Sequence, residues 1–341
     1  MQLRVLSGDD VRRAVSMAEA IEAVGRAFAS LTAGRAVSPL RTALDTALDT
    51  ALDTVRGTTL VMPAALRWAG TGANGEVAVE AGLGVKVVSV FAGNRALGLP
   101  TIHALVLMVD PATGVPRAVL DGTWLTALRT GAASGVATRH LARRDARVLT
   151  VFGAGVQARS QIEAVRCVRS VEEVRVVDRD GESAARLVGE LGDVRAVAVP
   201  DPRDALAGAD IVVTATTSPT PVFRGRDVEP GTHVNAIGAY TPETREVDGD
   251  LVLRSTVVVD DRGSALAEAG DLLIPLADGV IDTGHIRAEL GDLVLGRHPG
   301  RTRPDEITFF KSVGNAVQDV AVAQLAVARA EQEGWGVLAE L

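Results

Sequence analysis

Lysine is almost absent from this chain, so its two lysines are the first candidates for chemistry. Lys86 and Lys311 stand against thirty-three arginines. Arginine is a planar, permanently charged fork, whereas lysine is a compact point charge that can titrate, so the two are not equivalent in a tight site. A position that keeps lysine is a candidate for a role that guanidinium cannot fill. The count alone leaves open that genome composition favoured arginine and that both lysines persist by chance.

A glycine-rich turn at residues 153–158 has the pattern of a dinucleotide-binding loop. It reads GxGxxA, follows the buried-strand pattern of residues 147–152 and precedes a predicted helix. The first glycine permits a tight turn, the second lets the backbone approach a pyrophosphate, and the helix N-terminus supplies amides and a positive dipole. A tight turn that binds nothing is the alternative. The candidate cofactor-binding residues here are Gly153, Gly155, Val156 and Gln157.

An acidic residue follows the next predicted strand, where a ribose-binding acid belongs. Asp178 ends the strand at 173–178, about 25 residues after the glycine motif. A carboxylate there favours NAD, because its charge would repel a 2′-phosphate. The neighbouring Arg179 softens that preference and leaves NADP open.

Hydroxyl side chains end the fourth strand predicted for the same domain. Thr216 lies in a polar run at 214–218. The run falls at the carboxyl edge of the sheet, where ligands bind in such folds. The alternative is a polar cap that only ends the strand.

The composition is that of a folded globular protein. A chain of 341 residues is long enough for two domains. The formal charge of -8 and the aromatic content of 3% argue against a nucleic-acid partner. The single cysteine, Cys167, fits a reducing cytoplasm, and the five histidines show no metal spacing. The N-terminus has no apolar signal core and no window approaches a membrane span, so we expect neither targeting nor insertion.

The first part of the chain predicts one helix followed by strands. A stripe of apolar residues from Met17 to Leu31 predicts a helix that ends near Gly34. Apolar runs at 83–91 and 103–110, then a turn and a short strand to residue 120, indicate a β-rich domain. The tetrapeptide Ala-Leu-Asp-Thr, written three times over 43–54, predicts a surface hairpin or loop extension, and 70–75 a flexible tip.

From residue 123 the pattern changes to alternating strands and helices, which is typical of a parallel sheet. The fold class is therefore α/β, with a Rossmann-type doubly wound parallel sheet at 123–312 and a β-rich domain formed by 1–122 and 313–341. A helix at about 123–141 leads into the sheet, and a final helix at about 315–333 is expected to pack on the first domain. Strands are expected at 147–152, 173–178, 194–199, 210–216, 232–237 and 256–260.

Several ordered motifs extend over most of the chain. They are Gly98-Leu99-Pro100-Thr101, Asp121-Gly122, Leu125-Thr126-Ala127-Leu128-Arg129-Thr130, the glycine motif at 153, Asn235-Ala236-Ile237-Gly238, Arg245-Glu246-Val247-Asp248 and Lys311-Ser312-Val313-Gly314. Together they resemble the ornithine cyclodeaminase/μ-crystallin family. The resemblance implies a homodimer built through the β-rich domain, with a small imino or amino acid substrate held between that domain and the Rossmann domain.

The resemblance also implies roles for particular residues. Arg41, Lys86 and Arg129 match the basic residues that surround the family's substrate carboxylate and nicotinamide, and converging cations suit a carboxylate. In the last motif Ser312, rather than Lys311, carries the family's contact. The candidate substrate-binding residues are Arg41, Met62, Lys86 and Arg129. The candidate cofactor-binding residues outside the glycine motif are Thr101, Arg129, Asp178, Arg179, Thr216, Ile237, Gly238 and Ser312.

One residue departs from the pattern of true ornithine cyclodeaminases. Those enzymes place an Asp two residues beyond the Gly of the Asn-Ala-x-Gly motif, where this chain has Tyr240, its only tyrosine. A phenol, with an ordinary pKa of about 10, can donate a hydrogen bond but is a poor general base near neutrality. Tyr240 joins Lys86 and Arg129 as a catalytic candidate, although a wall residue without a chemical part is the alternative.

The resemblance is therefore closest to the branch of ketimine reductases and Δ1-pyrroline-2-carboxylate reductases. The expected reaction is reduction of a small cyclic imino acid, Δ1-pyrroline-2-carboxylate or Δ1-piperideine-2-carboxylate, with NAD(H) preferred and NADP(H) left open. Ornithine cyclodeaminase and an alanine-type amino acid dehydrogenase are the alternatives within the family. A nucleotide-regulated binding protein, as in μ-crystallin, is the alternative of another class.

Overall fold

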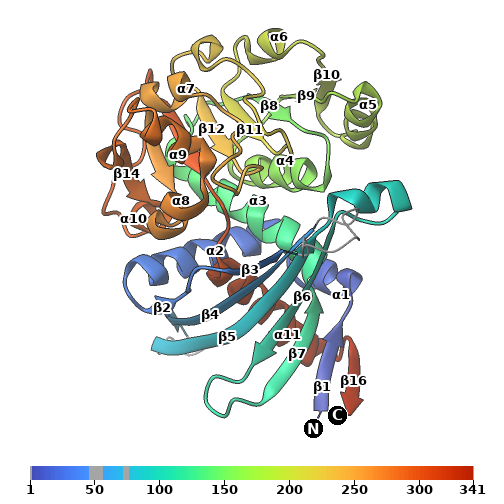
Figure 1. The fold of residues 1–341 in the computed structure, drawn as a ribbon. Coiled ribbons are helices and arrows are strands. Elements are labelled where there is room, and N and C mark those ends of the chain that lie inside the picture. Colours follow the sequence, from blue (N-terminus) through green and yellow to red (C-terminus); the bar gives the residue numbers. More distant parts are fainter. Residues whose placement is uncertain (1, 46–56, 72–76, 341) are drawn as a thin grey trace. The chain divides into compact units, whose positions relative to one another are not determined.

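The computed structural model describes residues 2–45, 57–71 and 77–340. Two compact units are present, Met1–Arg129 with Asn315–Leu341 and Thr130–Gly314, which we call units 1 and 2 (Figure 1). The sequence analysis places the domain boundaries at 122/123 and 312/313, and these boundaries remain a prediction. Among the described residues, no helix is both long enough and apolar enough to cross a bilayer.

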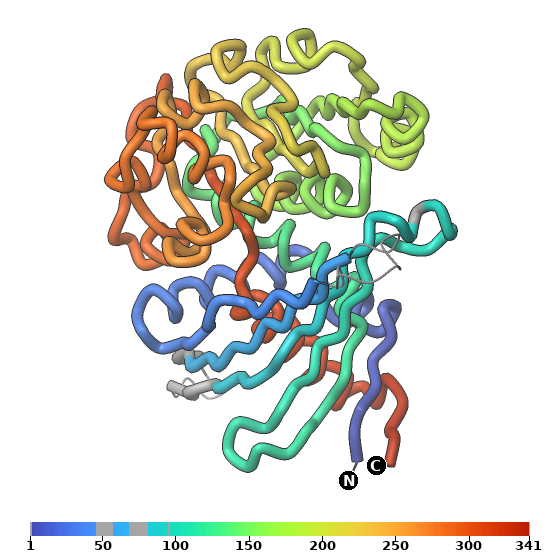
Figure 2. Tube along the Cα trace, in the orientation of Figure 1, coloured from blue at the N-terminus to red at the C-terminus, as the bar shows by residue number. Residues whose placement is uncertain are grey.

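Unit 1 is built on a mixed sheet in which β1 and β7 run parallel and the other neighbours antiparallel. The order is β16-β1-β7-β6-β5-β4-β2, and β3 also pairs with β4. Because β1 pairs with β16, the first and last described strands lie side by side (Figure 2). The strands are β1 Gln2–Leu6, β2 Ala36–Val37, β3 Thr42–Asp45, β4 Thr58–Thr71, β5 Val77–Val90, β6 Ile102–Val109, β7 Pro116–Asp121 and β16 Val337–Glu340.

The strand predictions for this unit hold where the structure describes the residues, whereas the predicted tip at 70–75 does not hold throughout. The runs at 83–91 and 103–110 and the short strand to 120 correspond to β5, β6 and β7, whereas β1, β4 and β16 were not expected. The predicted tip at 70–75 is wrong at its start, because Gly70 lies in β4 and pairs with Ala78. The rest of that tip, and the repeat beyond residue 45, lie outside the described residues.

Helices α1 (Gly8–Ala14), α2 (Met17–Thr32) and α11 (Ala316–Glu333) complete unit 1. Helix α2 begins where Ser16 and Glu19 cap each other's backbone amides, and Phe28 is among its buried residues. Helix α11 packs against α2 and against β4, β5 and β6. The predicted helix at 17–34 and the packing of the final helix on the first domain are therefore confirmed.

Unit 2 contains a parallel sheet in the order β10-β9-β8-β11-β12-β15-β13-β14. The six predicted strands are present within one or two residues. Two more were not expected, and one of them, β15, lies between β12 and β13. The strands are β8 Val148–Phe152, β9 Glu173–Val177, β10 Arg195–Ala198, β11 Ile211–Thr214, β12 His233–Ala236, β13 Ser255–Val259, β14 Ile286–Glu289 and β15 Ile307–Lys311.

Both faces of this sheet are covered, as the predicted doubly wound fold requires. Val212 belongs to one buried apolar cluster and its neighbour Val213 to another, and successive strand residues point to opposite faces. The chain leaves β8 toward β9 and β10 on one side and returns to β11 on the other, which makes a topological switch point between β8 and β11. The helices are α3 Gly122–Leu141, which begins in unit 1, α4 Val156–Val168, α5 Gly181–Glu190, α6 Pro202–Leu206, α7 Gly249–Arg254, α8 Arg262–Glu268, α9 Gly270–Ala277 and α10 Leu290–Val294.

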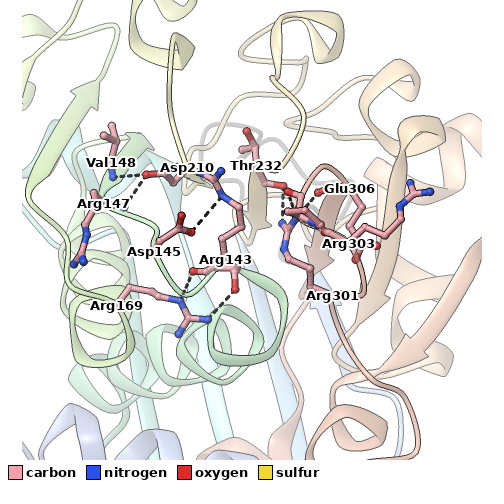
Figure 3. Close-up of polar contacts among 12 residues, drawn as sticks. Arg143, Asp145, Arg147, Val148, Arg169, Asp210, Thr232, Arg301, Arg303 and Glu306 are labelled. Atoms are coloured by element: carbon pink, nitrogen blue, oxygen red, sulfur yellow. Dashed lines mark hydrogen bonds and ion pairs between the residues drawn. The ribbon is translucent and has the colours of Figure 1, made fainter.

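Arginine side chains organise the amino edge of this sheet (Figure 3). The Asp210 carboxylate, just before β11, accepts the backbone amides of Arg147 and Val148 at 2.7 and 2.9 Å and pairs with Arg143. The Arg169 guanidinium donates to carbonyls in the last turn of α3 and just beyond it, so it caps the C-terminal end of that helix. These contacts are structural and lie at the edge opposite to the one where such sheets bind ligands.

Candidate functional site

The glycine motif lies at the switch point, at the carboxyl end of β8. Gly153 has a φ of +102°, and a Cβ on it would lie 2.5 Å from the carbonyl oxygen of Ala215, just after β11. Its amide donates to the Val177 carbonyl at 2.8 Å. Only glycine fits this turn, because a side chain would strain the backbone and strike the next loop.

The start of α4 is open toward the loop. Gly155 caps the helix without a side-chain hydrogen bond, and no atom lies within 4 Å of the place where its Cβ would be. Val156 is 63% exposed, and the buried Oε1 atom of Gln157 has no hydrogen-bond partner in unit 2. First-turn amides that no side chain caps suit an anion such as a pyrophosphate, so these residues fit a dinucleotide.

Asp178 lies beside this loop, as the ribose-binding interpretation requires. Its Oδ2 atom accepts the Ala154 amide at 2.8 Å, and its Oδ1 atom accepts the Asp180 amide at 2.9 Å. These bonds fix a partly exposed carboxylate at the end of β9. Arg179 is exposed, and no contact of its side chain with Asp178 is present.

A buried carboxylate joins the two loops that leave β11 and β12. Glu246 accepts the Thr216 amide at 2.6 Å, the Thr216 hydroxyl at 2.7 Å and the Gly238 amide at 2.6 Å. Burial raises the pKa of Glu246, against the opposing effect of the Lys311 ammonium. These contacts hold Thr216, Ile237 and Gly238 at the carboxyl edge of the sheet. The Thr216 hydroxyl is bonded to Glu246, which also agrees with the alternative that the polar run only caps the strand.

Ser312 follows β15 at the same edge, and its hydroxyl is engaged within unit 2. It donates to Asp260 Oδ2 at 2.7 Å, and the same oxygen accepts the amides of Val313 and Gly314. Burial raises the pKa of Asp260, although these donors oppose the shift. The contact fixes the backbone around Ser312 just before the chain returns to unit 1.

Unit 1 carries a separate, buried cluster of charges. The Lys86 ammonium on β5 lies 2.9 Å from both carboxylate oxygens of Asp319 on α11. Arg129, on α3, places its Nε atom 3.1 Å from Asp319 and donates to the amide oxygen of Gln318. All three charged side chains are buried. We call Lys86, Arg129, Gln318 and Asp319 the cation cluster.

Two glycines bring α11 close to β5. Gly82, Gly84 and Lys86 alternate along the strand and face the helix. A Cβ on Gly84 would lie 2.9 Å from the Met108 sulfur and 3.3 Å from a Val320 methyl group, and one on Gly82 would lie 2.8 Å from Val320. The helix can approach the sheet because these positions have no side chain, and Asp319 thereby reaches Lys86.

Burial is the main reason that Lys86 differs from an ordinary lysine. It lowers the pKa of Lys86 to about 7, and Arg129 and Arg41 add to the effect, while Asp319 opposes it. A charged group in a low dielectric is costly unless it is paired. Lys86 can therefore titrate near neutrality, which no arginine would do.

The other substrate candidates of unit 1 lie around the same strands. Met62 pairs with Lys86 across β4 and β5 and is buried, and Arg41 acts on Lys86 through its charge. Thr101 precedes β6, and its carbonyl accepts the Phe91 amide. In unit 2 the Tyr240 ring packs against the core cluster that includes Val247.

Several residues of these clusters were missed by the sequence interpretation. Asp319 lies between Val317 and Val320 in an apolar helix, and an acid in such a setting is a signal of a buried partner. Glu246 was noted only as part of a motif. Asp260 follows an apolar segment, and Asp271 precedes one. No local sequence pattern marks either residue, because their partners are distant in the sequence.

The glycine loop, the switch point and the parallel sheet define a protein with a Rossmann-type dinucleotide-binding fold joined to a second, β-rich unit. The chain belongs to the ornithine cyclodeaminase/mu-crystallin family, whose model matches residues 1–334, and the predicted family is confirmed.

Similar proteins cover nearly the whole chain. A Δ1-pyrroline-2-carboxylate reductase of Bacillus cereus is 38% identical over 336 residues, which are 97% of this chain and 98% of the relative. An alanine dehydrogenase of Archaeoglobus fulgidus is 35% identical over 98% of both chains. The solved structure of the Thermococcus litoralis Δ1-pyrroline-2-carboxylate reductase, in complex with NADH and L-proline, is 40% identical with a TM-score of 0.90 and covers 98% of this chain and 99% of that one.

Proposed function

We propose that this protein is an NADH-dependent reductase of a small cyclic imino acid, Δ1-pyrroline-2-carboxylate or its six-membered homologue Δ1-piperideine-2-carboxylate. The products are L-proline or L-pipecolate. The full-length similarity to Δ1-pyrroline-2-carboxylate reductases of two organisms supports the activity. The buried cation cluster around Lys86 is the observation that assigns the proposed activity to particular residues.

The cation cluster suits a substrate that carries one carboxylate. Lys86 and Arg129 bring two positive charges against the single negative charge of Asp319. A substrate carboxylate would compensate the remaining charge, and Arg41 adds a further cation nearby. We assign carboxylate binding to Lys86, Arg129 and Arg41, and part of the pocket wall to Met62. Fixing the carboxylate orients the ring, which is most of what a reactive C=N bond requires of the protein.

The cofactor, when bound, supplies the hydride for the C=N carbon. Gly153, Gly155, Val156 and Gln157 are proposed to hold the pyrophosphate and Asp178 the ribose, with Arg179 beside it. Thr101, Arg129, Thr216, Ile237, Gly238 and Ser312 complete the proposed cofactor residues. The open α4 terminus and the position of Asp178 support NADH over NADPH.

Tyr240 is the proposed proton donor to the nitrogen when the substrate binds as the neutral imine. Its ring packs against the apolar core of unit 2, which limits the directions that the hydroxyl can take. A phenol is suited to donating this hydrogen bond and unsuited to the base chemistry of a cyclodeaminase.

A homodimer is proposed through the outer face of the unit 1 sheet. Val87 and Leu105 are neighbours across β5 and β6 and point away from α11, with exposed fractions of 41% and 57%. Apolar neighbours exposed on a sheet are typical of an interface. A solved archaeal alanine dehydrogenase that is 34% identical is described as a dimer with bound NAD, which supports the assembly. The exposed, unpaired Cys167 fits the reducing cytoplasm that we propose as the compartment.

The proposal is tested by following the nicotinamide absorbance with both cyclic imino acids, with NADH and NADPH in parallel. Rapid oxidation of NADH without added ammonia supports the reductase. An L-ornithine assay runs alongside, and ammonia release from ornithine would show that another residue replaces the missing Asp and would contradict the proposal.

An alanine-type dehydrogenase is the second candidate, supported by the similarity to the Archaeoglobus fulgidus enzyme. An assay with pyruvate and ammonia distinguishes this dehydrogenase from the imino acid reductase, because only the dehydrogenase reaction depends on ammonia. Binding of NADH and of an imino acid without oxidation would instead indicate a binding protein.

A further inference from the structure

Lys311, the second of the two lysines, is buried at the end of β15 and has two close partners. Its ammonium lies 2.6 Å from Asp271 Oδ2 and donates to the Ala239 carbonyl at 2.6 Å. Both Lys311 and Asp271 have no solvent exposure. A buried ammonium needs a counter-ion and hydrogen-bond acceptors, and this one has them.

The partners of Lys311 lead to the loops at the carboxyl edge. Asp271 Oδ1 accepts the amides of Glu246 and Val247 at 2.7 and 3.0 Å, so it places the Glu246 backbone. The Glu246 carboxylate in turn accepts hydrogen bonds from the loop after β11 and from the loop after β12. Its donors are the Thr214 hydroxyl at 2.9 Å, the Thr216 amide at 2.6 Å and hydroxyl at 2.7 Å, the Gly238 amide at 2.6 Å and the Ala239 amide at 3.3 Å.

The fit around Glu246 is tight. A Cβ on Gly238 would lie 2.2 Å from the Thr216 carbonyl oxygen and 2.6 Å from Glu246 Oε1. A Cβ on Gly270, next to Asp271, would lie 2.1 Å from the Thr244 carbonyl oxygen. The two loops therefore have little freedom to move apart or together while the carboxylates are in place.

We infer that Lys311, Asp271 and Glu246 form a positioning network that holds the loops at Thr216 and at Gly238–Tyr240 in the arrangement that binds the dinucleotide. All three side chains have no solvent exposure, so they act through the loops that they hold. Lys311 fixes the Ala239 carbonyl directly before Tyr240, and Glu246 ties that loop to Thr216. The inference rests on the proposed function, because Thr216, Ile237 and Gly238 are proposed cofactor residues.

The geometry also explains why arginine does not replace lysine at position 311. The ammonium is a compact group between one carboxylate and one carbonyl, each at 2.6 Å, and no exposed surface is left for a larger head group. A guanidinium is wider and has five N–H donors to satisfy. Lys311→Arg should therefore resemble Lys311→Met more than the parent protein.

The test measures NADH binding by nicotinamide fluorescence, without turnover, together with thermal unfolding of the cofactor-free protein. The variants are Lys311→Met, Glu246→Gln and the double variant Asp271→Asn/Lys311→Met. We expect the single variants to raise the Kd for NADH about tenfold, because loops that are no longer preorganised must be ordered on binding. The double variant should recover part of the affinity, since it removes the unpaired carboxylate that Lys311→Met leaves.

If the network only stabilised the fold, its variants would lower the unfolding temperature without changing the Kd for NADH. Thr308→Val is the matched control, because Thr308 is buried on the same strand β15 but bonds to the Leu141 carbonyl near the amino edge. It should lower the unfolding temperature without changing the Kd for NADH. If the network variants also lose stability while binding NADH as tightly as the parent, the inference is wrong.

Two further outcomes keep the inference separate from the proposed function. If Lys311→Met does not fold, the milder Glu246→Gln decides the question by the same Kd. A parent protein that binds no NADH would overturn the proposed function, and the positioning role would fall with it. In the active enzyme, the network variants should raise the KM for NADH and leave the KM for the imino acid nearly unchanged.

Discussion

The Asp319 carboxylate on α11 lies 2.9 Å from the Lys86 ammonium on β5, and neither side chain is exposed. The pair places a counter-ion behind the lysine that the sequence marks as unusual. With Arg129 also on Asp319, the cluster keeps an excess of one positive charge when Lys86 is protonated. Such an excess in a buried site favours an anionic ligand.

Lys86→Met should lower kcat/KM for the imino acid by about ten- to a hundredfold and leave the Kd for NADH nearly unchanged. The substitution removes the proposed carboxylate partner, and the loss of a hydrogen bond to a charged group costs about 1.5–3 kcal/mol. Steady-state kinetics and NADH fluorescence measure the two effects. Arg117→Met is the control, because Arg117 is a cation of the same unit whose pair with Glu331 is exposed. Unchanged kinetics in Lys86→Met would remove this residue from the mechanism.

The affinity for the imino acid should fall as the pH rises through about 7. Burial lowers the pKa of Lys86 to about 7, so the ammonium is present below that pH and is lost above it. The KM for the imino acid should therefore rise on the alkaline side. Asp319→Asn removes the group that opposes this shift, so the rise should begin at lower pH. A KM profile that is flat from pH 6 to 8.5 (about one unit below the pKa and one and a half above it) in both proteins would contradict the assignment.

Stability should follow the same titration with a defined sign. The folded pKa of Lys86 lies below the ordinary value of about 10.4, so the unfolded chain binds more protons between those two values. The contribution of Lys86 to the free energy of unfolding therefore increases with pH across that window. Denaturant unfolding at several pH values, compared with Lys86→Met, should show this difference in slope.

Asp178→Ser should weaken NADH binding and reduce the discrimination against NADPH. The carboxylate favours the ribose hydroxyls and repels a 2′-phosphate, so its loss should cost about tenfold or more in NADH affinity. Fluorescence titrations with both cofactors give the ratio of Kd values. A ratio equal to that of the parent protein would mean that Asp178 only holds the Ala154 amide.

Tyr240→Phe should lower kcat mainly at high pH, where the substrate imine is neutral and needs a proton. At low pH the protonated imine is already an electrophile, and the variant should approach the parent rate. The pH profile of kcat is the measurement. An equal rate at all pH values would leave Tyr240 as a wall residue whose ring packs on the core.

Much of the fold could be predicted from local patterns, and the reasons differ from element to element. Helix α2 has an apolar stripe and a capping pair, and the turn at Gly153 has a fixed glycine spacing, so both can be recognised within a few residues. Strand β15 could not be placed in the same way. It pairs with β12 and β13, and this order depends on contacts between segments far apart in the sequence.

In the candidate site, too, some residues could be identified from the sequence and others only from the folded structure. Lys86 was identified from its rarity and from the family resemblance, whereas Asp319 comes from the far end of the chain and its role appears only when α11 packs on β5. Lys311 was singled out by its rarity alone, and the sequence assigned it to no site. Its partners Asp271 and Ala239 make it a buried structural cation of unit 2, which the residue count could not reveal.

Leu105→Glu should convert a dimer into a monomer. A charge in the middle of an apolar sheet face would be buried without a partner on association, which is costly. Sedimentation or light scattering gives the mass. Leu253→Glu is the matched control, because Leu253 is 51% exposed on α7 of unit 2 and Leu105 is 57% exposed. A parent protein that is monomeric at micromolar concentration would refute the proposed assembly.

Gly82 and Gly84 show that the Lys86–Asp319 pair depends on residues that carry no functional group. A single methyl group at either position would meet α11, or the strand beside β5, at less than 3 Å. The helix would have to move outward, and the acid on it would no longer reach the lysine. A search for related proteins by their charged residues alone would therefore overlook the glycines that let the helix approach the strand. The hydrogens that stand in place of side chains on Gly82 and Gly84 are as necessary to the Lys86–Asp319 pair as the two charged groups themselves.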